Sequence, residues 1–213
     1  MTRYNPALLK SRRTELICLA IVLAGLAWTG LAPYDRFTWW LETAPVWIAI
    51  PLLLYTARNF RLTPLLYLLI TLHALILMIG GKYTYARVPA GDWVRDWLHL
   101  GRNPYDRLGH LAQGFIPVIL SREILLRTSP LRRGNWLGFL SVSVCLAFSA
   151  LYELIEMATA LLQGSKADDF LGTQGDPWDT QWDMTCALFG AMLGYGLLRR
   201  IHDRQLTKLG VLQ

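Results

Sequence analysis

Cysteine is scarce in this chain of 213 residues, and the three that occur are Cys18, Cys145 and Cys186. Each lies inside an apolar stretch, their number is odd, and no CxxC pair is present. A disulfide framework and a cysteine-based metal site are therefore excluded, and we expect buried thiols.

Charge is also in short supply. Only 17% of the residues are charged, against about 25% in an ordinary soluble domain. Hydrophobic residues make up 54% of the chain and fall in long blocks. This pattern excludes a soluble globular domain, a disordered chain, a coiled coil and collagen, and it indicates a multi-pass membrane protein. The net charge of +6 comes from short basic clusters between apolar blocks, which argues against a nucleic-acid partner.

Six segments are long and apolar enough to span a bilayer. The fold class predicted from them is all-α, a polytopic bundle of about six transmembrane helices that forms a single integral membrane domain over residues 1–213. The predicted spans are residues 16–32, 39–57, 62–80, 106–126, 136–162 and 179–198.

The distribution of basic residues predicts the orientation of these spans. If both termini face the cytoplasm, the cytoplasmic side receives 14 of the 21 basic residues, as the positive-inside rule requires. These are Arg3, Lys10, Arg12, Arg13, Arg58, Arg61, Arg122, Arg127, Arg132, Arg133, Arg199, Arg200, Arg204 and Lys208.

The outer loop over residues 81–105 contains a short helical pattern. Trp93, Val94, Trp97 and Leu98 recur at helical spacing, which predicts a helix lying in the outer membrane interface. Packing of the same residues against the bundle is an equally open alternative.

Three of the predicted spans carry ionisable pairs close to their outer ends. Residues of this kind inside a membrane are rare and mostly functional. The members of each pair are three or four positions apart, so each pair shares one helix face. The pairs are Asp106 with His110, Glu153 with Glu156, and Asp179 with Asp183. Two alternatives stay open, namely helix capping by Asp106 and a structural ion-pair network.

Carboxylates in an apolar environment must pair, bind a cation or take up protons. We expect Glu153, Glu156, Asp179 and Asp183 to hold a divalent metal ion or to move protons. An oxygen-rich set with one histidine suits Mg, Mn, Ca, Fe or Zn without choosing among them.

The remaining site residues are assigned by their chemistry. We expect His110, Asp106 and Glu153 to act as catalytic acids or bases. Cationic side chains on the outer side are candidates for binding a phosphate or carboxylate headgroup, and these are Lys82, Arg102 and Arg107.

Four stretches of the chain resemble the YjdF-like family of bacterial inner-membrane proteins. They are GGKYTYARVP (80–89), NPYDRLGHLAQGF (103–115), ALYELIEM (150–157) and GDPWDTQWDM (175–184). The resemblance covers most of the chain and implies a multi-pass protein of the inner membrane, and it implies no particular reaction.

The C-terminal half is also distantly similar to VanZ-like membrane proteins, which are associated with glycopeptide resistance. Asp106, Arg107 and His110 match the acidic-basic pair and histidine of that family, and Glu153 matches the Glu of its Glu-x-x-Gln motif. This chain departs from the pattern at Glu156, which replaces the Gln, and at Ala187, which replaces an Asn.

The leading functional hypothesis is a periplasm-facing, metal-assisted enzyme that acts on an envelope lipid or a lipid-linked precursor, with membrane lipids as partners. One alternative is a proton-coupled transporter, although no internal repeat is visible and the ionisable pairs lie away from the midplane. The other alternative is a non-catalytic envelope protein that binds a ligand or confers resistance. Substrate-dependent turnover would separate the enzyme from both alternatives.

Overall fold

The computed structural model describes residues 12–163 and 174–212, and every regular element in these ranges is a helix. The predicted all-α class is therefore confirmed. The elements are α1 (Arg13–Gly30), α2 (Arg36–Thr56), α3 (Pro64–Tyr83), the 3-10 helix η2 (Tyr85–Arg87), α4 (Pro89–Leu98), α5 (Tyr105–Phe115), α6 (Pro117–Thr128), α7 (Asn135–Gln163) and α9 (Asp179–Lys208).

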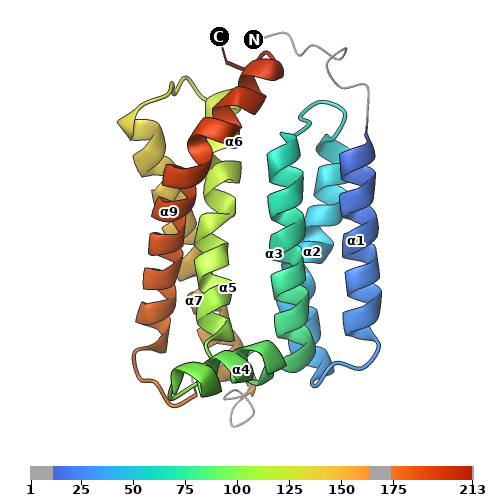
Figure 1. The fold of residues 1–213 in the computed structure, drawn as a ribbon, viewed down its shortest axis with the longest axis vertical. Helices are drawn as coiled ribbons and strands as arrows, with labels where there is room; N and C mark the ends of the chain where they lie inside the picture. Colours follow the sequence, from blue (N-terminus) through green and yellow to red (C-terminus); the bar gives the residue numbers. More distant parts are fainter. Residues whose placement is uncertain (1–11, 164–173, 213) are drawn as a thin grey trace.

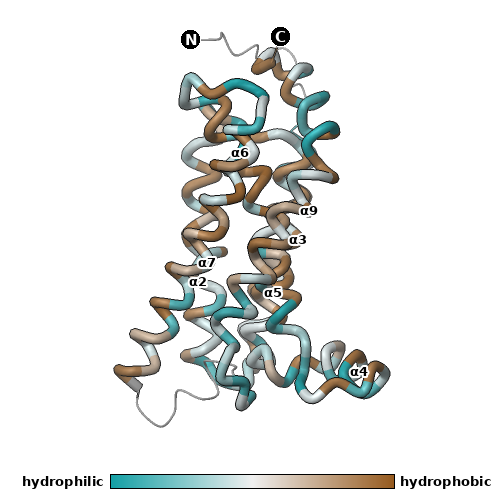
Figure 2. Tube along the Cα trace, turned by 90° about the vertical axis from the view of Figure 1, so that its left-hand side faces the viewer, coloured by the Kyte–Doolittle hydropathy of each residue, from teal (hydrophilic) through white to brown (hydrophobic). Residues whose placement is uncertain are grey.

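Four helices, α1, α2, α3 and α7, are long and apolar enough to cross a membrane by length and composition. The long α9 and the pair α5–α6 coincide with the other two predicted spans but are more polar. Hydrophobic residues dominate the middle of the bundle, and hydrophilic residues gather toward its two ends (Figure 2). Helix α9 continues ten residues beyond the predicted limit, because His202 and Leu206, four positions apart, are still buried against the bundle.

The predicted span over residues 106–126 is divided into two helices. Helix α5 ends at Phe115 and α6 begins at Pro117, with Ile116 between them. Pro117 has no backbone N–H to donate to the preceding turn, and its ring favours the first position of a new helix. The predicted span is therefore formed by two consecutive helices that meet at Ile116.

The helices form two groups, α1–α3 on one side and α5, α6, α7 and α9 on the other (Figure 1). Helix α3 contacts members of both groups. A buried apolar cluster that includes Leu66, Ile119, Cys145 and Ala191 joins them. The start of α1 and the end of α9 lie at the same end of the bundle, as expected if both termini share one side of the membrane (Figure 1).

Helices α5 and α9 make the closest contact of the bundle through three glycines. A Cβ atom on Gly114 would collide with the backbone carbonyl of Ala187. In the same way, Gly190 faces the carbonyl of Leu111 and Gly194 that of Phe115. Gly190 and Gly194 form a Gly-x-x-x-Gly pair on α9 that serves close helix packing, and α5 is the partner helix.

Replacing Gly114 with Ala is expected to destabilise the protein by about 1–3 kcal/mol, because two packed backbones have to move apart. The midpoint of unfolding by sodium dodecyl sulfate in mixed micelles measures the change. Gly196→Ala is the matched control, since no atom lies within 4 Å of a Cβ atom built at that position. Equal midpoints for the two variants would contradict the close contact.

Helix α4 crosses the end of the bundle opposite to the start of α1, nearly at right angles to the long helices (Figure 1). The predicted helix in this loop is therefore confirmed. Trp93 is 74% exposed and Trp97 is 79% exposed, so these side chains do not pack on the described part of the bundle. Their exposure favours the interfacial alternative, in which the indole rings lie among lipid headgroups.

Candidate metal centre

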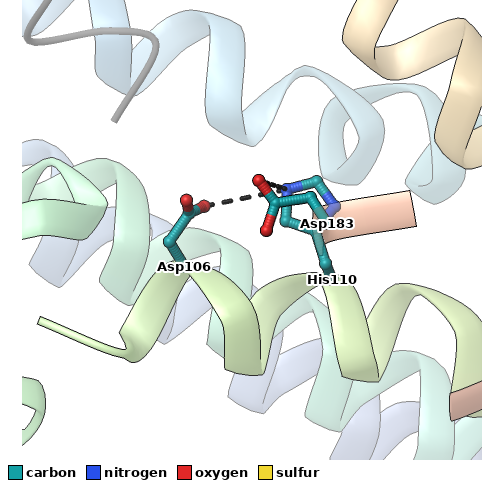
Figure 3. Close-up of side chains that lie close together, drawn as sticks. All are labelled: Asp106, His110 and Asp183. Carbon is teal, nitrogen blue, oxygen red and sulfur yellow. Dashed lines mark ion pairs between the residues drawn. The ribbon is translucent and has the colours of Figure 1, made fainter. Parts of the chain in front are cut away.

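The close contact of α5 with α9 brings their ionisable residues together. Asp106 and His110 lie on one face of α5, and Asp183 of α9 faces them (Figure 3). His110 Nε2 lies 3.7 Å from Asp106 Oδ1 and 3.9 Å from Asp183 Oδ2. One potential ligand atom of each residue lies within 4.8 Å of the other two, and all three residues are buried. We call these three residues the α5–α9 cluster.

Helix α7 places Glu153 beside the α5–α9 cluster. Glu153 Oε1 lies 3.8 Å from His110 Nδ1, and the residue is only 8% exposed. Within the described residues, neither of these two atoms has a hydrogen-bond partner. Buried polar atoms are normally hydrogen-bonded, because leaving them unpaired costs free energy. A proton or a cation bound between Glu153 Oε1 and His110 Nδ1 would remove this cost. Polar side chains from α5, α7 and α9 therefore lie close together around His110.

Two arginines surround the α5–α9 cluster, and both contact carboxylates. Arg102 forms ion pairs with Asp179 and, at 3.1 Å, with Asp106. The Nη2 atom of Arg107 lies 2.7 Å from Asp176, and its Nε atom lies 3.7 Å from Asp183 Oδ1. These contacts join the start of α5 to the start of α9.

Asp176 precedes α9 and lies outside the helix. The backbone N–H of Trp178 and the Arg107 guanidinium stabilise its charged form, so the pKa of the Asp176 carboxyl lies below its usual range. This carboxylate is therefore a permanent partner for Arg107 at neutral pH.

The structure does not bring Lys82 to the α5–α9 cluster. Its Nζ atom lies 3.4 Å from the carbonyl oxygen of Trp28 and 5.0 Å from the centre of the Trp28 ring, on the side of α1. Of the three cationic residues expected to bind a headgroup, only Arg102 and Arg107 therefore lie beside His110.

The four carboxylates expected to bind metal divide into two sets. Asp183 belongs to the α5–α9 cluster. Glu156 and Asp179 line a cavity of about 330 Å³ between α7 and α9. Glu153 lines the same cavity and also contacts His110, so it connects the cavity to the cluster.

Sequence reasoning missed Glu42, which is buried in α2 at 3% exposure. Its Oε2 accepts a hydrogen bond of 2.8 Å from the Tyr152 hydroxyl, and the Tyr152 ring stands edge-on to His110 with 6.4 Å between the ring centres. The criterion that singled out Glu153, an acidic residue inside an apolar span, applies equally to Glu42.

Sequence reasoning also missed a second buried polar network, at the opposite end of the bundle. Glu123 is fully buried and contacts Arg127 at 2.7 Å and His202 Nε2 at 2.9 Å. Arg122 donates to His202 Nδ1 at 2.8 Å and forms an ion pair with Asp203. Arg122 can only donate hydrogen bonds, so Nδ1 of His202 accepts one from it. The imidazole proton is therefore on Nε2, and this N–H donates a hydrogen bond to Glu123 Oε2.

The distribution of basic residues placed Arg122 and Arg127 on the cytoplasmic side of the membrane. In the structure Arg122 is buried and contacts residues of α9, and Arg127 contacts Glu123 of its own helix. We call Arg122, Glu123, Arg127, His202 and Asp203 the α6–α9 network.

Comparisons with known proteins identify the family. The family described as "Predicted membrane protein (DUF2238)" matches residues 14–204. Inner membrane protein YjdF of Escherichia coli (strain K12) is 53% identical over 199 residues, which cover 93% of this chain and 94% of that protein. No solved structure matches the chain.

Proposed function

This chain belongs to the DUF2238 family of predicted membrane proteins, and from that premise we propose that it is a metal-dependent enzyme of the inner membrane. Its substrate would be an envelope lipid or a lipid-linked precursor, and its metal would bind at the α5–α9 cluster. One observation carries the proposal. Asp106, His110 and Asp183 offer three ligand atoms within 4.8 Å of one another in a buried place.

The donor set fits a divalent transition metal. Two carboxylates and one imidazole supply three ligands, and catalytic metal sites with three protein ligands keep a further position for water or substrate. A metal bound there would lower the pKa of a bound water and polarise a phosphoryl oxygen. The proposed ligands come from helices whose backbones are in contact, so the set has little freedom to spread.

The neighbouring residues have separate tasks in this proposal. Glu153 lies between His110 and the cavity, where it can accept or return a proton during hydrolysis. Arg102 and Arg107 hold Asp106 and the start of α9 in position through their ion pairs. We assign contact with a substrate phosphate to the metal, because both guanidinium groups already contact carboxylates.

One observation favours a second candidate, proton-coupled transport. The interruption between α5 and α6 resembles the broken helices that line transporter sites, and Ile116 is less than two turns from His110. The glycine contacts of α9 with Leu111 and Phe115 oppose it, because they leave no room for a polar path along the α5–α9 contact. We therefore rank the enzyme first.

The test uses the purified protein in lipid nanodiscs that contain phosphatidylethanolamine and phosphatidylglycerol. Elemental analysis measures bound metal, and mass spectrometry follows headgroup or phosphate release with added Zn²⁺, Mn²⁺ or Mg²⁺. A product that forms with metal and not with EDTA supports the enzyme. Bound metal with no product from these lipids or from an envelope lipid extract would overturn catalysis in favour of a binding protein. If elemental analysis finds no bound metal under any of these conditions, the proposal of a metal site at the α5–α9 cluster is wrong.

A further inference from the structure

We infer that the cavity between α7 and α9 binds the ammonium group of an amine-bearing lipid. The cavity has a volume of about 330 Å³, which is within the usual range for small-molecule sites. Its polar lining comes from Glu153, Glu156, Asp179 and Thr180. Its apolar lining comes from the last turns of α7, namely Met157, Ala160 and Leu161. Binding of such a lipid does not depend on the proposed enzyme function. Its assignment as the substrate class does rest on that function.

The charge of the cavity selects a cation. Among the described residues, its lining contains three carboxylic acids and no Lys or Arg. Asp179 is neutralised by its ion pair with Arg102, so Glu153 and Glu156 remain to face a ligand. An anionic phosphate placed there would be repelled, whereas an ammonium group would be attracted and would donate hydrogen bonds.

The buried oxygen of Glu153 gives the second observation. Glu153 is only 8% exposed, and its Oε1 atom has no hydrogen-bond partner among the described residues. A primary ammonium carries three N–H donors, so it can bind the carboxyl groups of Glu153 and Glu156, which both line the cavity. Hydrogen bonds between charged partners are the strong ones in such surroundings.

The apolar wall indicates that the amine belongs to a lipid. Met157 is 54% exposed and Leu161 is 77% exposed, and they follow one another at a spacing of four on α7. In a membrane-spanning helix these side chains face lipid chains. A ligand with an ammonium headgroup and an attached apolar chain therefore matches both walls of the cavity, which a free polar amine does not.

The experiment uses EDTA-treated protein, so that the outcome does not depend on a bound metal. Native mass spectrometry measures retention of phosphatidylethanolamine and of phosphatidylglycerol from mixed vesicles. We expect at least about a tenfold preference for the amine lipid, and Glu156→Gln should reduce that preference about tenfold, the effect of roughly 1.4 kcal/mol. Asp96→Asn is the control, because Asp96 is exposed on α4 and pairs with Arg95. Gel filtration of each variant verifies folding.

Calorimetry with hexylamine separates the two possible sources of the amine. Weak hexylamine binding beside strong lipid retention supports a lipid ligand, as inferred. Hexylamine binding as tight as lipid retention would overturn the lipid assignment and leave a free-amine site. Equal retention of the two lipids by the wild type, or an unchanged preference in Glu156→Gln, would overturn the inference. Neither result affects the metal centre, which is measured separately.

Discussion

Asp183→Asn is expected to weaken binding of Zn²⁺ or Mn²⁺ by more than about 100-fold. Loss of an outer partner of a metal ligand already costs about 10–100-fold in affinity, and Asp183 would be a ligand itself. It is 3% exposed and presents Oδ2 to His110 at 3.9 Å, on the same side as Asp106. Isothermal titration calorimetry of metal-free protein in detergent measures the affinity directly.

Two further variants make this result specific. Asp96→Asn removes a carboxylate at the same end of the protein but outside the α5–α9 cluster, and it should bind metal like the wild type. Glu156→Gln should also retain most of the affinity, because Glu156 lines the cavity and is outside the three-residue set. If Glu156→Gln and Asp183→Asn lose the metal equally, the ligand set is the one expected from the sequence. If neither variant loses it, the metal lies elsewhere.

Arg127→Met is expected to lower the free energy of unfolding by about 3 kcal/mol, because it leaves the buried Glu123 carboxylate without its cationic partner. Methionine preserves the apolar part of the side chain but also removes the guanidinium group, whose carbon lies 3.6 Å from the centre of the Phe60 ring. The free energy comes from titration with sodium dodecyl sulfate in mixed micelles, followed by circular dichroism.

Two comparisons separate this effect from a general loss of charge. Arg133→Met removes an arginine that is 53% exposed and 3.9 Å from Asp203, so its cost should stay below about 1 kcal/mol. The double variant Arg127→Met with Glu123→Gln removes the stranded carboxylate and should recover most of the stability. A double variant as unstable as Arg127→Met alone would show that packing, and not charge, causes the loss.

The sequence was sufficient to predict the parts of this protein that depend on local patterns. Apolar block length predicted the helices, and spacing within one helix placed Asp106 beside His110 on one face of α5. The sequence also placed each ionisable pair close to the outer end of its span, and in the structure residues of α5, α7 and α9 lie close together around His110. These predictions needed only the helical repeat and the thickness of a bilayer.

Contacts between distant residues could not be predicted in this way. Tyr152 and Glu42 are 110 positions apart, and Glu123 and His202 are 79 apart, so no helical spacing relates them. The burial of Arg122 could not be predicted for the same reason, since it depends on α9 extending past residue 198. The sequence gives the positions of the charged residues, but the contacts between them depend on how the helices pack.

The glycine contact between α5 and α9 has a consequence for the route by which an ion arrives. Gly114 and Gly190 let the two backbones touch, so no gap between these helices admits a hydrated ion. Arg102 and Arg107 cover the loop side of His110 with their paired carboxylates. Among the described residues, the remaining approach is along α7, where Glu153 borders the cavity and lies beside His110. At the proposed metal centre, an arriving cation would therefore meet the Glu153 carboxylate before the His110 imidazole.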